Sequence, residues 1–105
     1  MDLRKYQKDV DGISISENDI QKMVAPVLTL NQSSNELCDR VRSAGMERRE
    51  EDSEEIVRLC ASCISCISMI ASNYRISLND VAKASLQMLN ECHNLNDRWI
   101  IGKRL

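Results

Sequence analysis

Residues 59–68 read LCASCISCIS, an uncharged stretch in which Cys60, Cys63 and Cys66 recur at every third position. Ferredoxin-type iron–sulfur sites use C-x-x-C-x-x-C in a loop, with a fourth cysteine close by. Here the stretch contains no Gly or Pro, and the next cysteine is 26 residues further on. A zinc site would need a fourth ligand, for which His93 is the sole histidine. We therefore interpret the triplet as small packing residues of a helix, with metal binding and redox sensing as alternatives.

The stretch lies within a predicted helix from about residue 53 to 73. No charged residue occurs from Leu59 to Ser72, and apolar or small side chains surround most of the helix axis. Such a helix is expected to be buried on all sides, at the centre of a bundle or in an oligomer interface. The acidic stretch 46–55 is interpreted as a solvated connector plus the acidic first turn of this helix, with an acidic metal-binding rim as the alternative.

Two further helical regions carry their own start signals. Ser16 opens a capping box completed by Asp19, and apolar residues then follow at alternating spacings of three and four. Pro26 interrupts this pattern, so we expect a short helix over 17–24 and a longer one over 26–44. Gly45 is suited to end the second of these.

Ser77 opens another capping box, with Asp80 three residues later. The helix that follows is predicted from residue 78 to about 95. Its apolar stripe consists of Leu78, Val81, Ala82, Ser85, Leu89 and Cys92.

Length and composition favour one all-α domain. The chain has 105 residues, 43% of them hydrophobic but only 3% aromatic, with a single Pro and three Gly. Strands favour aromatic and β-branched residues, so a composition this poor in aromatic residues favours helices. We predict a four-helix-bundle-like fold over residues 16–95, after an irregular segment over 1–15. A tail over 96–105 follows, which docks through Trp99 or packs on a second chain.

Charge and cysteine usage exclude several classes of partner. The net charge of −2 gives no pull toward nucleic acid or an anionic membrane. No apolar run is expected to reach the roughly 18 residues of a membrane span, and the polar N-terminus lacks the apolar centre of a signal peptide. We predict a cytoplasmic protein with five reduced cysteines. A helix this apolar in so small a chain favours a homo-oligomer, a dimer or tetramer.

Acidic pairs are the remaining candidates for chemistry. Glu36 and Asp39 share one helix face, and Asp52 and Glu55 share another. Two helices that each offer two carboxylates can hold Mg²⁺, which prefers oxygen ligands and binds phosphate substrates. The alternative is that these pairs are ordinary surface charges. No other cofactor is expected.

Two longer stretches carry a family resemblance. Residues 28–41, LTLNQSSNELCDRV, and residues 76–89, ISLNDVAKASLQML, flank the charged connector and the apolar helix. In this arrangement the chain resembles the MazG-like all-α nucleoside triphosphate pyrophosphohydrolases over about residues 20–99. That resemblance implies a helical dimer or tetramer. It also implies Mg²⁺ held by Glu-x-x-Glu and Glu-x-x-Asp pairs, and cleavage between the α and β phosphates.

The family's metal pairs are incomplete here. The first pair aligns with Ser33 and Glu36, and the second aligns with Leu59 and Ser62. A shift by one helical turn pairs Glu55 with Arg58, a cation that would disfavour Mg²⁺. Only offsets in both helices restore acids, as Glu36/Asp39 and Asp52/Glu55. The resemblance is therefore to a catalytically degenerate member.

Arg40 and Arg58 are the candidate ligand-binding residues. Arg58 is the one charge in the neutral run after Glu55, and as a buried cation it would need a carboxylate or phosphate partner. We prefer a structural salt bridge with Glu54, Glu55 or Asp39, and a bound nucleotide phosphate is the alternative.

Three functions remain open. The first is a non-catalytic, nucleotide-binding or regulatory oligomer, a pseudoenzyme of the MazG-like type. The second is an active Mg²⁺-dependent pyrophosphohydrolase that uses Glu36, Asp39, Asp52 and Glu55. The third is a helical adaptor that works only through protein contacts.

Overall fold

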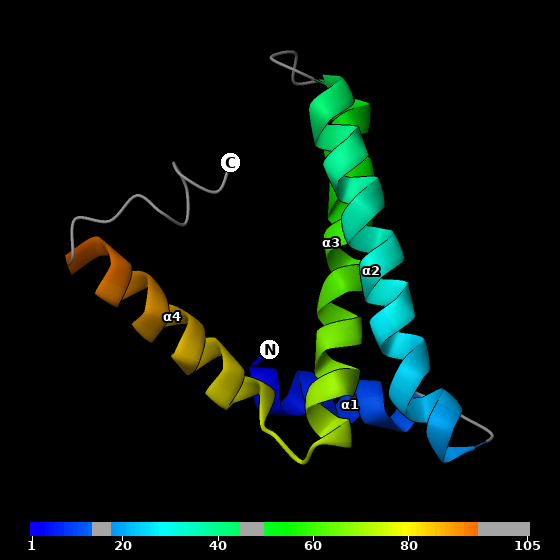
Figure 1. Cartoon of the computed structure of the whole chain (residues 1–105), viewed down its shortest axis with the longest axis vertical. Coiled ribbons are helices and arrows are strands. Elements are labelled where there is room, and N and C mark those ends of the chain that lie inside the picture. The colour runs from blue at the N-terminus through cyan, green and yellow to red at the C-terminus, as the bar shows by residue number, and fades with distance from the viewer. Residues whose placement is uncertain (14–17, 45–49, 95–105) are drawn as a thin grey trace.

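The computed structural model describes residues 1–13, 18–44 and 50–94. They form four helices and no strands: α1 (Leu3–Ile13), α2 (Asp19–Ala44), α3 (Glu50–Asn73) and α4 (Leu78–Asn94). Helices α2 and α3 form a long antiparallel hairpin, α1 lies across its base, and α4 leads away from it (Figure 1). The all-α prediction is confirmed for these residues. The tail with Trp99, the cap residues Ser16 and Gly45, and residues 46–49 of the predicted connector lie outside them. Residues 50–55 of that connector form the first turns of α3.

The predicted irregular segment is wrong over most of its length, because residues 3–13 form α1. The Asp2 carboxylate caps this helix by accepting from the Lys5 backbone amide at 2.8 Å. Leu3, Tyr6 and Val10 share one half-buried side. Its four apolar residues, Leu3, Tyr6, Val10 and Ile13, do recur at spacings of three and four. Polar and charged residues outnumber them, which is why the segment was expected to be irregular.

Helix α2 is continuous through Pro26, so the predicted division into 17–24 and 26–44 is also wrong. Proline has no amide hydrogen to donate to the carbonyl of Lys22. The side-chain amide of Asn73 on α3 donates to that carbonyl at 2.9 Å instead. A contact between helices thus replaces the missing bond within the helix. Asn18 caps the start of the helix, because its side-chain oxygen accepts from the Gln21 backbone amide at 2.7 Å.

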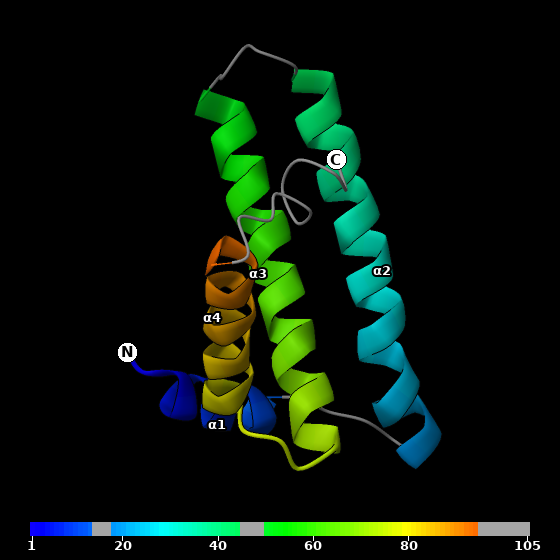
Figure 2. The same ribbon diagram turned by 60° about the vertical axis from the view of Figure 1, so that its left-hand side comes forward.

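The contact between α2 and α3 is the most extensive one between elements, and the two helices lie side by side in every view (Figures 1 and 2). Along α3, the buried residues Asp52, Leu59 and Cys66 lie seven positions apart. Buried residues at intervals of seven are typical of helices that pack side by side along their length. Near the middle of this seam, the hydroxyls of Ser33 and Ser62 lie 2.7 Å apart. Small side chains here allow a close approach of the two helices.

Helix α3 starts and ends close to its predicted bounds, but the expectation that it is buried on all sides is wrong. Val57 is 67% exposed, and Cys60, Ile64 and Ile67 are exposed on the same side. Within the described chain, only α2 covers the upper part of α3, whereas α1 and α4 contact it near the base (Figure 1). By length and composition, Asp52–Asn73 is also apolar enough to cross a membrane, so the prediction that no apolar run reaches that length is wrong. A soluble core helix passes the same test.

The turn between α3 and α4 is closed by backbone hydrogen bonds. The amide of Ile76 donates to the carbonyl of Ala71 at 2.8 Å, and that of Arg75 donates to Ser72 at 3.0 Å. This is the Schellman pattern, and Arg75 occupies its left-handed position with a φ of 57°. Ser77 then caps α4 as predicted, since its hydroxyl accepts from the amide of Asn79 at 3.1 Å.

Candidate functional site

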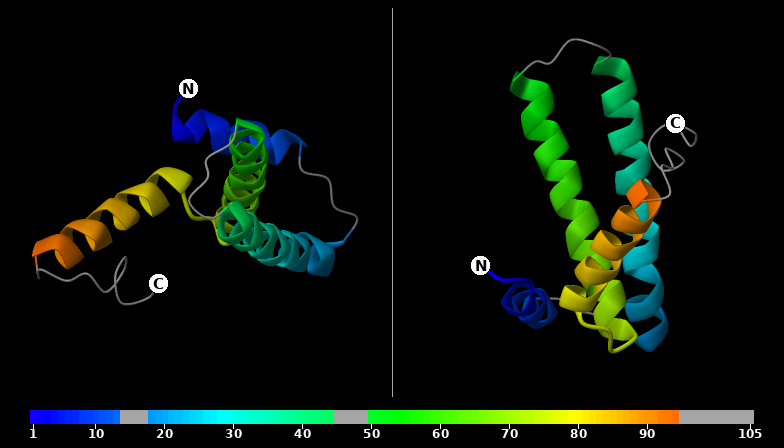
Figure 3. Two further views of the ribbon diagram at one scale, coloured as in Figure 1. Left: turned by 90° about the horizontal axis from the view of Figure 1, so that it is seen from above. Right: turned by 90° about the vertical axis from the view of Figure 1, so that its left-hand side faces the viewer.

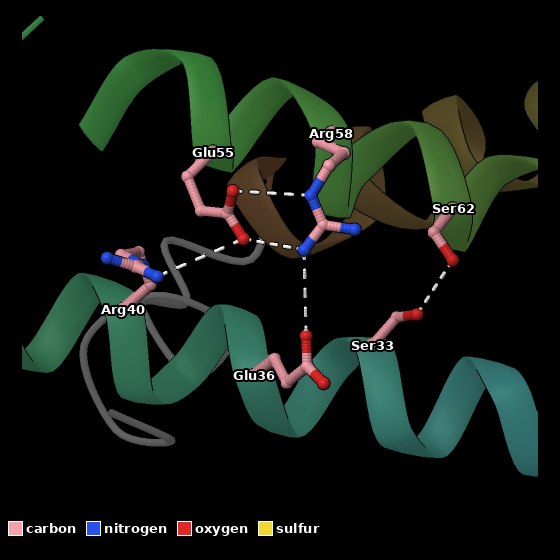
Figure 4. A network of polar contacts seen from close by, with 6 residues as sticks. All are labelled: Ser33, Glu36, Arg40, Glu55, Arg58 and Ser62. Carbon is pink, nitrogen blue, oxygen red and sulfur yellow. Dashed lines mark hydrogen bonds and ion pairs between the residues drawn. The ribbon is translucent and has the colours of Figure 1, made fainter. Parts of the chain in front are cut away.

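A charged cluster lies between α2 and α3 (Figure 4). It is in the half of the hairpin that is remote from α1 (Figure 1). Glu36 and Arg40 come from α2, and Glu55 and Arg58 from α3. Each pair is spaced by three or four residues, so both members of a pair point to the same side of their helix. The hairpin brings the two sides together, as expected for residues flanking its seam.

Arg58 binds Glu55 through two parallel hydrogen bonds. Its Nε donates to Glu55 Oε2 at 3.2 Å, and its Nη2 donates to Oε1 at 2.5 Å. The same Nη2 lies 3.8 Å from Glu36 Oε2, which links the two helices. Arg40 Nη2 lies 3.9 Å from Glu55 Oε1. The guanidinium of Arg58 is therefore already engaged by carboxylates of its own chain.

The electrostatics follow from these contacts. The hydrogen bonds from Arg58, reinforced by the positive charges of Arg58 and Arg40, lower the pKa of Glu55 below its ordinary value. The bonds to Glu55 raise the pKa of Arg58 in turn. Both groups are held in their charged forms. The prediction of a buried Arg58 is wrong, because its side chain is 62% exposed. Exposed ion pairs of this kind contribute little to stability.

A hollow of about 390 Å³ lies beside this cluster. Its lining includes Glu36, Asp39, Arg40 and Glu55, together with Ser43 and Leu59. Three of the four predicted metal ligands therefore converge on one space, while Asp52 is buried in the hairpin. Among the described residues, no group of three or more His, Cys, Asp or Glu side chains has a geometry that could hold a metal. The guanidinium of Arg58 lies among the carboxylates.

The cysteine triplet is distributed around α3. Cys60 is exposed, Cys63 is half-buried and Cys66 is buried in the seam, and all three are free thiols. Burial raises the pKa of Cys66, with a smaller contribution from Cys63, so the thiol stays protonated at neutral pH. This agrees with the packing interpretation for Cys66. Cys60 instead lies on an exposed apolar side of the helix, which the sequence pattern did not reveal.

The second feature that sequence reasoning missed is Gln7. Its side-chain amide donates to Ser72 Oγ at 3.0 Å and to the carbonyl of Ile76 at 2.9 Å. Its side-chain oxygen accepts from the amide of Leu78 at 2.8 Å. One residue of α1 thus binds the end of α3, the turn and the start of α4. No sequence signal marks it, since all three partners are more than 60 positions away.

No protein-family model, curated protein or solved structure matches this chain.

Proposed function

We propose that this chain is a helical interaction subunit that acts through protein contacts and performs no chemistry of its own. The observation that carries the proposal is the exposure of its apolar side chains. Among the Leu, Ile, Val and Met residues in the described parts of the chain, only Leu59 and Leu78 are buried. Twelve others are exposed on α2, α3 and α4: Ile20, Met23, Val24, Val27, Leu28, Val41, Val57, Ile64, Ile67, Leu86, Met88 and Leu89.

This exposure exceeds what a monomeric soluble protein ordinarily tolerates. Isolated apolar side chains on a surface are normal, but contiguous apolar helix faces mark contact sites. A chain of 105 residues with so few buried large side chains also gains little stability from its own core. Both considerations favour a protein whose apolar helix faces are covered by association with another protein chain.

The charged cluster supports the same proposal. A nucleotide phosphate would have to displace Glu55 from the two hydrogen bonds it accepts from Arg58. Mg²⁺ would have to approach carboxylates that already face a guanidinium, which like-charge repulsion opposes. The cluster is well suited to hold α2 and α3 in register.

The test is a thermal-shift screen of the purified chain against nucleoside mono-, di- and triphosphates and cyclic nucleotides, with and without Mg²⁺. Pyrophosphate release and molar mass are measured in parallel. We expect no nucleotide-dependent shift, no pyrophosphate and a mass above the 12.0 kDa of one chain. Stabilisation that requires Mg²⁺, accompanied by pyrophosphate, would overturn the proposal.

A second candidate function is Mg²⁺-dependent binding or cleavage of a nucleotide in the MazG-like manner. The convergence of Glu36, Asp39 and Glu55 on one hollow favours it. In that case Glu36→Gln should abolish any Mg²⁺-dependent shift. Glu91→Gln is the matched control, because Glu91 lies on α4 and accepts from the Gln87 amide. Equal responses of the two variants would reject this candidate.

A further inference from the structure

Helix α4 has one apolar side that the described chain leaves open. A hollow of about 290 Å³ runs along it, lined by Val81, Ala84, Ser85, Met88 and Leu89. We call these five residues the α4 face. No charged side chain lines it, so an occupant must itself be apolar. The charged residues of this helix, such as Lys83 and Glu91, do not line the hollow.

Helix α3 has a second open side, formed by Val57, Cys60, Ile64 and Ile67, which we call the α3 face. The spacings of three, four and three place these residues on one side of the helix. Toward the base, the same side continues through Ser68 and Ala71, which are buried. The α3 face is thus the exposed continuation of a surface that is covered at the base.

The chain's own α4 is not positioned to cover this face. From the base of the molecule, α4 diverges from the hairpin, as Figure 1 and the view from above in Figure 3 show. The divergence is fixed by the Schellman turn and by Gln7, which binds Ser72, Ile76 and Leu78 together. Closing α4 onto its own α3 would break these hydrogen bonds.

We propose that a second copy of this chain covers both faces. The α4 face of each copy lies on the α3 face of the other, around a twofold axis. This inference rests on the proposed function and specifies its partner. A second copy fits because one chain carries both complementary faces, and a twofold axis then satisfies both at once.

The sizes of the two faces agree with this arrangement. The α3 face extends over the eleven residues 57–67 and the α4 face over the nine residues 81–89, which is roughly 15 Å and 12 Å of helix. Each copy contributes both faces, so every contact is made twice in the dimer. A standard interface buries about 800 Å² per partner. Val57, Ile64, Ile67, Met88 and Leu89 are between 37% and 67% exposed, so each copy offers apolar surface from both faces toward that area.

The test introduces one charged side chain into each of the two faces and measures self-association. Met88→Glu alters the α4 face, and Ile64→Lys alters the α3 face. Each variant alone should weaken self-association by about 30-fold or more, because a charge would be buried in an apolar contact. Leu86→Glu is the matched control. Leu86 is 64% exposed on the same helix but does not line the α4 face, and its variant should associate like the wild type. Sedimentation velocity measures all three.

Mixing the two variants gives the decisive result. In a mixed pair, one contact is the native one, and in the other the introduced glutamate faces the introduced lysine. We expect the mixture to form dimers although each variant alone is monomeric. A mixture that stays monomeric, or a dimer weakened equally by Leu86→Glu, would overturn the inference.

A wild-type chain that is monomeric at all accessible concentrations would also overturn the inference. The proposed function has a separate test, because it fails when a nucleotide with Mg²⁺ is bound and cleaved. Each failure can therefore be recognised without the other.

Discussion

The α2–α3 hairpin and α4 are built from similar amphipathic sequences but reach different outcomes. In the hairpin, the apolar stripe of α3 is buried against α2 through residues such as Leu59 and Cys66. In α4, only Leu78 and Cys92 of the predicted stripe are buried, and the residues between them are half-buried or exposed. A periodic stripe therefore predicts that a helix has a side to cover. Whether the chain itself covers that side depends on the angles of its turns.

The largest expected effect is at the hairpin seam. Leu59 is 2% exposed, so Leu59→Ala leaves a cavity and should lower the free energy of unfolding by about 2–5 kcal/mol. Val57→Ala, two residues away on the exposed side, is the control and should change it by less than about 0.5 kcal/mol. Urea unfolding at a concentration where the protein is monomeric measures both. Comparable losses would show that the two sides of α3 are equally covered.

The next effect is at the joint between the two regions. Gln7→Ala removes three hydrogen bonds and leaves the amide of Leu78 without its acceptor. We expect a loss of about 1–3 kcal/mol, together with a looser α4. Gln87→Ala is the control, because that side chain makes an exposed hydrogen bond within α4. If Gln7→Ala proved as mild as the control, α1 would not set the angle between α3 and α4.

A gain in stability is expected at Ser68. This residue is 0% exposed, and its hydroxyl has no hydrogen-bond partner in the described part of the chain. Ser68→Ala should raise the free energy of unfolding by about 1 kcal/mol, because it removes an unsatisfied buried group. Ser65→Ala serves as the comparison, since the Ser65 hydroxyl donates to the carbonyl of Ala61 at 2.7 Å. A thermal melt of each variant measures the change in stability. A loss of stability in Ser68→Ala would show that the Ser68 hydroxyl has a hydrogen-bond partner.

The smallest effect is the pH dependence of the charged cluster. The Arg58 hydrogen bonds lower the pKa of Glu55, so its contribution is present above the unfolded-state pKa. It is lost as the pH falls through the lower pKa of the folded state. Glu55→Gln should therefore reduce the melting temperature slightly at neutral pH, and the difference should vanish in acid. A difference that grows with acidification would contradict this sign.

Much of the fold could be predicted from the sequence because its signals are local. The uncharged run after Leu59 and the Ser77 cap each depend on neighbours within a few residues, and α3 and α4 follow them closely. Two predictions, the break at Pro26 and the irregular N-terminal segment, were wrong because contacts between residues far apart in the sequence determine the structure there. Asn73 replaces the hydrogen bond that Pro26 cannot make, and Gln7 holds α1 on the base of the hairpin.

The candidate site was predicted only in part. The spacing of Glu36, Asp39 and Glu55 brought these carboxylates to one hollow, as expected for two adjacent helices. The position of Arg58 depends on which side of α3 meets α2, and the sequence pattern suggested burial where the structure has exposure. Absolute rotation of a helix within a bundle is set by packing and is not encoded in periodicity alone.

The most direct test of the account is amide hydrogen exchange of the wild-type chain, measured over a range of protein concentrations. Exchange at the seam around Leu59 should be slow at every concentration, because the chain itself covers it. Amides of α4 between Val81 and Leu89 should become protected as dimers form, in parallel with those around Ile64. Protection of α4 that is independent of concentration would contradict the claim that a second copy covers it.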